Sequence, residues 1–264
     1  MLAELHPHPR DKDISFQENG HIYNINGDKY YKSCTTWIKS FFEKFDADAI
    51  IDRMMAKSDW PSSKYFGMTK QEIKAQWNKN GATSASYGTD MHAIIEDYYN
   101  NIIRECDKPE YKYFMNFAED HKHLKPYRTE MMVYDEDLRI CGSIDMLFQN
   151  DDGTLSIYDW KFAKELNMTS AFRKKALHPI QHLDDCNYTH YSLQLNVYRM
   201  ILERKYGFQV KDMFLIFMHQ NLSDNYVKVE VNPIDMDPLI KKQMTEKLKT
   251  EKRKTEKTNQ NELK

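Results

Sequence analysis

The sequence predicts a mixed α/β or α+β fold, in which a mixed sheet is flanked by helices. Helical periodicity dominates the first half of the chain, three successive strands follow, and a further helix precedes two last strands. The chain has 264 residues, of which 41% are hydrophobic and 13% aromatic. It is therefore long and apolar enough to bury a sizeable core rather than remain disordered.

The elements of the first half follow from turn and capping signals. Asn26-Gly27 predicts a hairpin turn between two short strands, and Ser33, Thr35 or Thr36 predicts the cap of a helix through Phe42. Further helices are expected at about 48–57, 71–78, 89–106 and 111–121. The segment NKNGATSASYG predicts a loop before Thr89, which would cap the helix that follows it.

The second half alternates strands with a single long helix. Strands are expected at 128–134 and in a hairpin over 142–162, and 164–185 has no clear period. Thr189 predicts the start of a helix to Lys205, which Gly207 would end. The apolar run DMFLIFMH predicts a strand covered on both faces, and YVKVEVNP alternates as an outer strand does.

The hairpin at 142–162 carries an unusual pair of acids. Asp145 and Asp159 lie equally far from the centre of the turn Asn150-Asp151-Asp152-Gly153, so a symmetric hairpin places them opposite each other. Facing carboxylates are unfavourable unless a proton or a cation lies between them. Mg²⁺ or Mn²⁺ would meet that need, and Lys161, on the same strand face as Asp159, could contact a water or a phosphate there. This set of side chains suits phosphodiester hydrolysis.

Charge and cysteine content exclude several classes of protein. The net charge is −2, but residues 241–264 carry nine Lys or Arg against four Asp or Glu, which leaves −7 for the rest. This basic tail is either a phosphate-binding segment or a solvated helix.

No apolar run reaches the roughly 20 residues of a membrane span, so we expect a soluble, intracellular protein. Four scattered cysteines without a CxxC pair predict neither a zinc ribbon nor an iron–sulfur cluster.

Four segments together resemble the PD-(D/E)XK nuclease superfamily. Gly142-x-x-Asp145 followed by Asp159-Trp160-Lys161 is similar to its catalytic hairpin. Three further segments resemble the RecB-like exonuclease branch, which includes phage, viral and mitochondrial genome-maintenance enzymes; they are YGTDMHAIIE, QLNVY and HIYNINGDKYYKSCTTWI. The resemblance implies a restriction-endonuclease-like core with an N-terminal helical arch, and host cytoplasm or nucleus as the location if the protein is viral.

The resemblance also assigns roles to individual residues. His92, Asp145, Asp159 and the backbone carbonyl of Trp160 would hold Mg²⁺ or Mn²⁺, and Lys161 would stabilise the charge on the phosphate. Glu96 would either order a water or hold His92, and Glu130 would contact a second metal or a water unless it is simply an exposed strand residue. Gln194 and Tyr198 would contact DNA near the scissile phosphate. Aromatic rings such as Trp60, Trp77 and Tyr87 would stack on unpaired bases or belong to the core.

The functional expectation is a metal-dependent DNA exonuclease that acts on single strands or ends. A structure-specific endonuclease of the same fold and a non-catalytic nucleic-acid-binding subunit are the alternatives. No GxxxxGK[ST] motif occurs, so no nucleotide cofactor or motor is expected. We expect one nuclease domain over 1–264, with an N-terminal hairpin and helical part (20–125), a catalytic core (126–235) and a basic C-terminal helix or tail (236–264).

Overall fold

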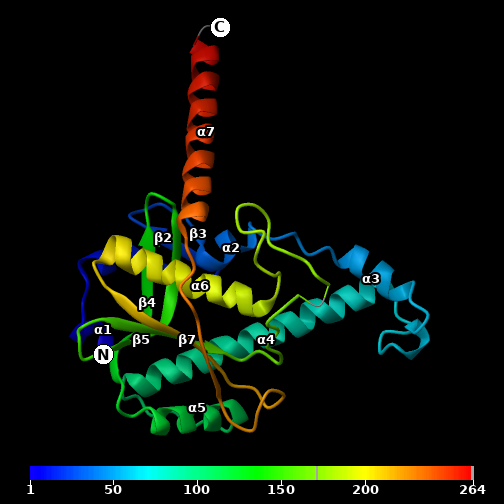
Figure 1. The fold of residues 1–264 in the computed structure, drawn as a ribbon, viewed down its shortest axis with the longest axis horizontal. Coiled ribbons are helices and arrows are strands. Elements are labelled where there is room, and N and C mark those ends of the chain that lie inside the picture. The colour runs from blue at the N-terminus through cyan, green and yellow to red at the C-terminus, as the bar shows by residue number, and fades with distance from the viewer. Residues whose placement is uncertain (171, 263–264) are drawn as a thin grey trace.

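The computed structural model describes residues 1–170 and 172–262, and the side chains of 1–170 and 172–250 (Figure 1). In chain order its helices and strands are α1 (Leu2–Leu5), β1 (Ile14–Gln17), β2 (Ile22–Ile25), β3 (Lys32–Ser33), α2 (Cys34–Lys39), α3 (Ala47–Met55), α4 (Lys70–Tyr99), α5 (Pro109–Asp120), β4 (Lys125–Asp135), β5 (Ile140–Gln149), β6 (Leu155–Lys161), α6 (Asn187–Ile201), β7 (Val210–Phe217), β8 (Val227–Glu230) and α7 (Asp237–Glu262).

A six-stranded mixed sheet forms the centre of the molecule and confirms the predicted fold class. Its strands pair in the order β3-β5-β6-β7-β8, with β4 also paired to β5. β4, β5 and β6 are antiparallel neighbours, whereas β7 is parallel to β6 and follows it through α6. β8 closes the sheet as an antiparallel edge strand beside β7.

Strand β5 has an interruption along one of its edges. β4 pairs with β5 over its full length, so β3 and β6 must share the opposite edge. β3 pairs there with Ile140 and Cys141, and β6 pairs with 146–149. The intervening stretch, Gly142 to Asp145, therefore lies between two partner strands. On this edge, residues 142–145 are paired with neither β3 nor β6, so the regular ladder is interrupted there.

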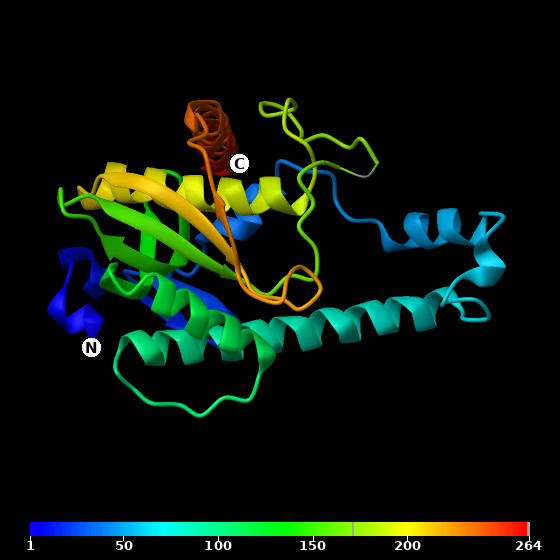
Figure 2. The same cartoon turned by 60° about the horizontal axis from the view of Figure 1, so that its bottom comes forward.

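Helices cover both faces of the sheet. In Figure 2, α6 lies over one face, and α5 with the C-terminal part of α4 lies over the other. Alternate residues of β6 divide between the two cores: Leu155 and Ile157 join the core under α6, whereas Tyr158 and Trp160 join the core under α4 and α5. Because each face of the sheet is covered, the strand is almost wholly buried, and the period of two leaves Asp159 and Lys161 on the α6 side.

Helix α4 is one continuous helix of 30 residues, and the prediction of a loop at 78–88 was wrong. Thr69 caps it through a reciprocal bond with Glu72, and Thr89 lies in its interior, where its hydroxyl donates to the carbonyl of Ala85. Gly81 and Gly88 weaken a helix without breaking it, because each costs only about 1 kcal/mol relative to alanine. The helix ends at Tyr99 rather than at Cys106.

The first half of α4 and the whole of α3 extend away from the sheet as a helical arm, defined here as residues 47–80 (Figures 1 and 2). The arm has its own small core around Ile51, Tyr65 and Ile73, to which Trp60 and Trp77 add their rings. At the opposite end of the chain, α7 projects outward from the body (Figure 1). The basic side chains of 251–264 lie outside the described residues.

The N-terminal hairpin differs from the prediction in its pairing. Asn26-Gly27 does form a tight turn, with positive φ at both residues and backbone bonds between Ile25 and Asp28. However, the partner of β2 is the upstream strand β1, and β3 leaves to pair in parallel with β5. The remaining predicted elements agree to within a few residues: Ser33 caps α2, α5 and β4–β8 are present, and Gly207 with φ of 70° follows α6.

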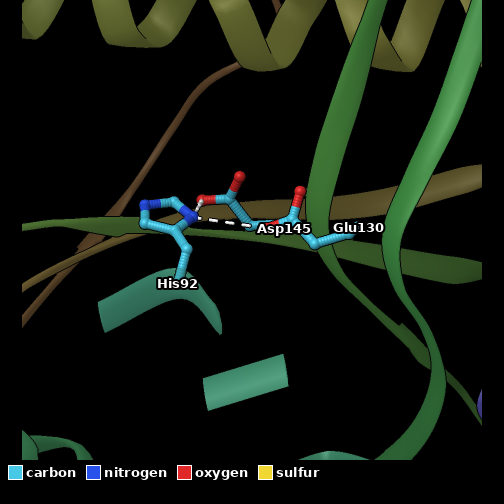
Figure 3. Close-up of side chains that lie close together, drawn as sticks. All are labelled: His92, Glu130 and Asp145. Carbon is cyan, nitrogen blue, oxygen red and sulfur yellow. Dashed lines mark hydrogen bonds and ion pairs between the residues drawn. The ribbon is translucent and has the colours of Figure 1, made fainter. Parts of the chain in front are cut away.

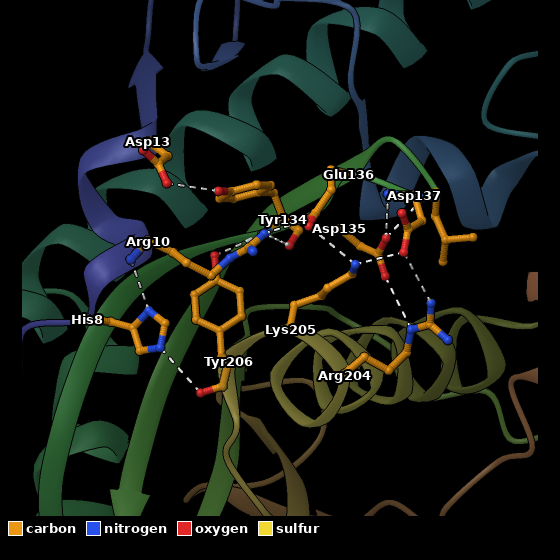
Figure 4. Close-up of polar contacts among 11 residues, drawn as sticks. His8, Arg10, Asp13, Tyr134, Asp135, Glu136, Asp137, Arg204, Lys205 and Tyr206 are labelled. Carbon is orange, nitrogen blue, oxygen red and sulfur yellow. Dashed lines mark hydrogen bonds and ion pairs between the residues drawn. The ribbon is translucent and has the colours of Figure 1, made fainter.

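A polar network joins the N-terminal segment and the π-helical turn Leu202–Tyr206, which follows α6, to the turn between β4 and β5 (Figure 4). Arg10 binds Glu136 at 2.7 Å and lies 3.9 Å over the Tyr134 ring, while Lys205 binds Asp137 at 2.7 Å. Asp135 is fully buried, and one of its oxygens accepts two backbone N–H groups of the turn. The network fixes the strand on which Glu130 lies.

Replacing Gly81 by alanine should stabilise the protein by about 1 kcal/mol, because a Cβ there meets no atom within 4 Å and the helical backbone suits alanine. Gly153→Ala is the matched control. It is equally open, but its φ of +82° should make the substitution destabilising by about 1 kcal/mol. Urea denaturation of both variants measures the two changes. A loss of stability in Gly81→Ala would contradict a continuous α4.

Candidate functional site

Three side chains from different elements converge beside the interrupted edge of β5 (Figure 3). His92 of α4, Glu130 of β4 and Asp145 of β5 each offer one ligand atom, and these atoms lie within 4.8 Å of one another. His92 Nδ1 is 3.4 Å from Glu130 Oε1 and 3.5 Å from Asp145 Oδ2. Two neighbouring ligands of an octahedral Mg²⁺, each at about 2.1 Å, are separated by about 3 Å. The donor set and its spacing therefore fit one divalent ion.

Strand register explains why the acids gather here. Glu130 falls between the pairs Thr129↔Met146 and Met131↔Ile144, so it lies opposite Asp145. On the other edge, the pair Met146↔Tyr158 has the register that the sequence predicts, which brings Asp159 level with Asp145. Three neighbouring strands thus present three carboxylates in one row.

Strands β5 and β6 separate at the position where the two aspartates would face each other. They pair from Gln149↔Leu155 to Met146↔Tyr158, and beyond that point the carboxylate of Asp145 accepts a hydrogen bond from the backbone N–H of Trp160 at 2.8 Å. Asp159 lies outside the converging cluster and is paired with Lys161, whose Nζ is 2.5 Å from Oδ2. The set that converges is thus His92, Glu130 and Asp145, rather than the predicted His92, Asp145 and Asp159.

Trp160, the fourth predicted metal ligand, contributes to the site only through its backbone. Its indole ring is 2% exposed and belongs to the core under α4 and α5. Its N–H is already bound to Asp145, as described above. The side chain therefore anchors the end of β6. The prediction of a metal ligand at Trp160 concerns only its backbone carbonyl.

Lys161 is held from several sides, and its side chain is only 14% exposed. Its Nζ donates to Gln194 Oε1 at 3.4 Å and lies 4.8 Å from the centre of the Tyr191 ring. Burial alone would lower the pKa of Lys161, but the carboxylates of Asp159 and Asp145 outweigh this and raise it. The ammonium group therefore stays charged at neutral pH.

Gln194 and Tyr198 lie on one face of α6, as their spacing predicts, and of the two it is Gln194 that contacts Lys161. Gln194 Nε2 donates to the Tyr198 hydroxyl at 3.1 Å, and Tyr198 is only 4% exposed. The Tyr198 ring packs directly on Gly142 of β5. A Cβ at that position would lie 2.8 Å from Tyr198 Cε1, which is closer than real contacts allow. Gly142 thus permits the packing that supports Gln194 and, through it, Lys161.

In this cluster the pKa values of His92 and Asp145 are raised, whereas that of Glu130 is lowered. Burial alone would lower the pKa of His92, but Asp145 and Glu130 outweigh it and raise the value to about 9. Burial raises the pKa of Asp145, and the nearby carboxylates of Asp159 and Glu130 add to that increase. For Glu130 the effect of burial is overcome by His92 and by the Ser143 hydroxyl, so its pKa is lowered. Without a metal, the cluster holds a proton in place of a cation.

The backbone of Glu130 is strained. Its φ of 42° is in the left-handed region, although it is a non-glycine residue inside a strand. Such a conformation costs about 1–3 kcal/mol and is concentrated at functional sites. Ser143 Oγ donates to Glu130 Oε2 at 2.7 Å and fixes the carboxylate toward His92. This backbone conformation directs the Glu130 side chain toward His92 and Asp145.

The other predicted residues occupy different environments. Glu96 lies one turn beyond His92 on α4, and its pKa is raised by burial and by the nearby Glu130. His92 makes its described contacts with Glu130 and Asp145 instead of with Glu96. The rings of Trp60 and Trp77 pack in the core of the helical arm, and the Tyr87 hydroxyl bonds to Glu110.

Sequence reasoning did not assign a role to Ser143, nor to the aromatic residues of the β1–β2 hairpin. Ser143 is two residues before Asp145, so the strand period of two could have placed it on the same face. Phe16, His21 and Tyr23 line a cavity beside His92, although no pattern in the chain brings that hairpin to α4. Local sequence patterns do not predict a contact between segments so far apart in the chain.

A family profile described as PD-(D/E)XK nuclease superfamily matches residues 110–263, more than half of the chain. The protein belongs to this superfamily. The matched range contains Glu130, Asp145, Asp159 and Lys161, whereas His92 precedes it. Membership implies a nuclease that depends on a divalent metal, and the cluster of His92, Glu130 and Asp145 is a candidate metal site.

Comparison with other proteins adds little detail to this superfamily assignment. No curated protein sequence matches the chain. A solved structure titled "Crystal structure of SSO0001" is 14% identical, with a TM-score of 0.31 over 65% of this chain and 63% of its own, so the chain spans less than two-thirds of that protein. Within the described part of the chain, no helix combines the length and apolarity that crossing a bilayer requires.

Replacing Gly142 by alanine should destabilise this nuclease by about 1–3 kcal/mol, because the added Cβ collides with the buried Tyr198 ring. The same substitution in a Tyr198→Leu background should cost less, since the colliding ring atoms are absent and the two effects are coupled. Denaturant unfolding of the four proteins gives the coupling free energy. Strictly additive losses would show that Gly142 and Tyr198 act independently.

The metal-free protein should lose stability as the pH rises from about 6.5 through 9. The folded-state pKa of His92 is raised to about 9, so its protonation stabilises the fold fully below the unfolded value of about 6.5 and is lost above 9. Denaturation in EDTA across this range should show the decline in wild type and a weaker decline in His92→Gln. The exposed His123→Gln is the control and should follow wild type. Parallel curves for wild type and His92→Gln would contradict the assignment.

Proposed function

We propose that the protein is a DNA exonuclease of the RecB-like branch that uses Mg²⁺ or Mn²⁺ and acts on single strands or DNA ends. The observation that carries this proposal is the charged Lys161–Asp159 pair beside the convergent His92, Glu130 and Asp145. A cationic side chain and a carboxylate-rich metal site are the two components that phosphodiester hydrolysis requires. The basic tail of residues 241–264 would add a sequence-independent attraction for phosphates.

In this proposal His92, Glu130 and Asp145 hold the ion, and Asp159 and the carbonyl of Trp160 complete its protein ligands. The ion when bound supplies electrophilic activation of the phosphate and lowers the pKa of water. Buried against Asp145, Asp159 is 1% exposed, and within the described residues its carboxylate oxygens accept no well-aligned hydrogen bond. Its one described partner is the Lys161 ammonium group, 2.5 Å from Oδ2, and a buried carboxylate with so few partners is suited to bind a second cation.

Lys161 binds and orients the phosphate. Its charge is maintained at neutral pH, and Gln194 and Tyr191 restrict where the ammonium group can lie. The negative charge on the phosphate oxygens grows as water adds to phosphorus and the sugar oxygen leaves, so a fixed cation nearby lowers the barrier. Gln194 then positions Lys161, and Tyr198 supports Gln194 from within the core.

Glu96 is the residue that we assign to the attacking water. Its carboxyl group lines the same cavity as His92 and Glu130, and its raised pKa makes it a better proton acceptor than an ordinary carboxylate. We propose that the helical arm, which is continuous with the helix that carries His92, favours strand ends over internal sites. We further propose that residues 1–264 act as one nuclease domain with the boundaries given above.

Lys161→Ala and Asp159→Asn should each reduce cleavage by about 10³-fold while DNA binding survives, because both remove charge from the reacting centre and not from the binding surface. Lys211→Ala and Asp212→Asn on the neighbouring strand β7 are matched controls and should retain activity. The measurement is a gel assay with 5′- and 3′-labelled single- and double-stranded DNA in Mg²⁺, Mn²⁺ or EDTA. Full activity in either site variant would contradict the proposal.

The same assay separates the alternatives. An exonuclease leaves circular single-stranded DNA intact and degrades the linear form, whereas an endonuclease cuts both. The label that is released first gives the polarity, and an RNA oligonucleotide of the same sequence tests the choice of sugar. Binding without cleavage of any substrate in any metal would instead identify a non-catalytic subunit.

A further inference from the structure

A cavity of about 600 Å³ lies between the β1–β2 hairpin and α4, directly beside the candidate metal site. It shares His92 and Glu130 with that site, and Glu96 also lines it. Any group that enters it is therefore next to the phosphate that the ion and Lys161 would hold. Apart from the attacking water that we assign to Glu96, the cavity has no assigned occupant.

One wall of the cavity is a cluster of three aromatic rings on the hairpin. The centres of Phe16 and Tyr23 are 4.7 Å apart, those of Phe16 and His21 are 4.9 Å apart, and those of His21 and Tyr23 are 5.9 Å apart. Tyr23 packs against the main core and anchors the group, whereas Phe16 remains 36% exposed. A contiguous apolar patch that gathers at a groove is a feature of ligand-binding surfaces.

The opposite wall is a stripe of small residues on α4. Ser84, Gly88, His92 and Glu96 follow one another at intervals of four, so they share one face of the helix, and Ala85, Thr89 and Ala93 lie beside them. A Cβ at Gly88 would meet no atom within 4 Å, so this wall leaves open space. The stripe continues along α4 to His92 of the metal site.

The charges around the cavity indicate which part of a nucleotide fits. Glu18, Glu96 and Glu130 line it, so a phosphate is disfavoured there unless a cation accompanies it. A nucleobase is uncharged and flat, and it stacks on aromatic rings with little dependence on its identity. A paired base inside a duplex has both faces covered by its neighbours, so only an unpaired base can offer a face to Phe16.

We propose that this cavity is a base-stacking subsite for one unpaired nucleotide adjacent to the scissile phosphate, with Phe16 and His21 as the stacking residues. The inference rests on the proposed function and extends it. It assigns single-stranded or locally unpaired nucleic acid as the substrate class at this position. It also makes the β1–β2 hairpin a substrate-binding element instead of a structural extension of the sheet.

The test combines protein variants with abasic substrates. The full-length protein binds a single-stranded oligonucleotide in Ca²⁺, and one abasic site is moved through the sequence one position at a time. Wild type should lose roughly tenfold in affinity when one particular position is abasic, as expected for a single stacked base. Phe16→Ala should bind the intact strand roughly tenfold more weakly and should no longer respond to the abasic site at that position.

Three further variants sharpen the interpretation. Phe16→Tyr should restore wild-type affinity because it keeps an aromatic ring, whereas Phe16→Leu, which keeps apolar area without a ring, should not. Tyr30→Ala is the control from the same segment, since Tyr30 is 87% exposed and does not line the cavity. It should behave as wild type on every substrate.

The outcomes separate this inference from the proposed function. If wild type cleaves DNA but Phe16→Ala keeps the wild-type response at every abasic position, the subsite is wrong and the nuclease assignment stands. Restoration of affinity by Phe16→Leu would equally contradict stacking. If wild type neither binds nor cleaves nucleic acid in any metal, both proposals fail together.

Discussion

The central constraint on the structure is the negative charge of three carboxylates that lie in a row on neighbouring strands. Glu130, Asp145 and Asp159 occupy successive strands at the same level of the sheet. At such separations like charges disfavour ionisation, and burial strengthens the effect. The compensation comes from His92 on one side, from Lys161 on the other and, in the proposed active form, from a divalent ion. The positions of α4, which carries His92, and of the end of β6, which carries Lys161, bring these cations to the carboxylates.

The need to place cations beside these carboxylates explains several local features that are energetically unfavourable by themselves. The strands β5 and β6 separate so that Asp145 can bind the Trp160 N–H, and β4 holds Glu130 in a left-handed conformation to turn its carboxylate toward His92. Each feature opposes regular sheet geometry. The surrounding contacts hold them in place: the network at the β4–β5 turn fixes one end of β4, and the Tyr198 ring seated on Gly142 fixes the start of β5.

The part of the site that local pattern determines could be predicted from the sequence. The turn at 150–153 determines the register of Asp145 and Asp159, and strand period two places Lys161 with Asp159. The cluster itself was predicted only partly, because separation of the strands and the strain at Glu130 arise from tertiary contacts. Likewise, Gly81, Gly88 and the nearby serines and threonines suggested a loop, yet α4 is continuous. Residues 78–86 are exposed, so their own packing does not explain this; they connect two packed ends of the helix, at Ile73 in the arm and at Ile95 against the sheet, and these ends outweigh the weak helix propensity between them.

The central claim is that one divalent ion lies between His92, Glu130 and Asp145. The most direct measurement is an anomalous difference map from crystals of the full-length protein soaked in Mn²⁺. The account predicts a peak about 2.1 Å from His92 Nδ1 and from a carboxylate oxygen of Asp145. A site that stays empty at saturating Mn²⁺, with His92 and Asp145 still in direct contact, would contradict it.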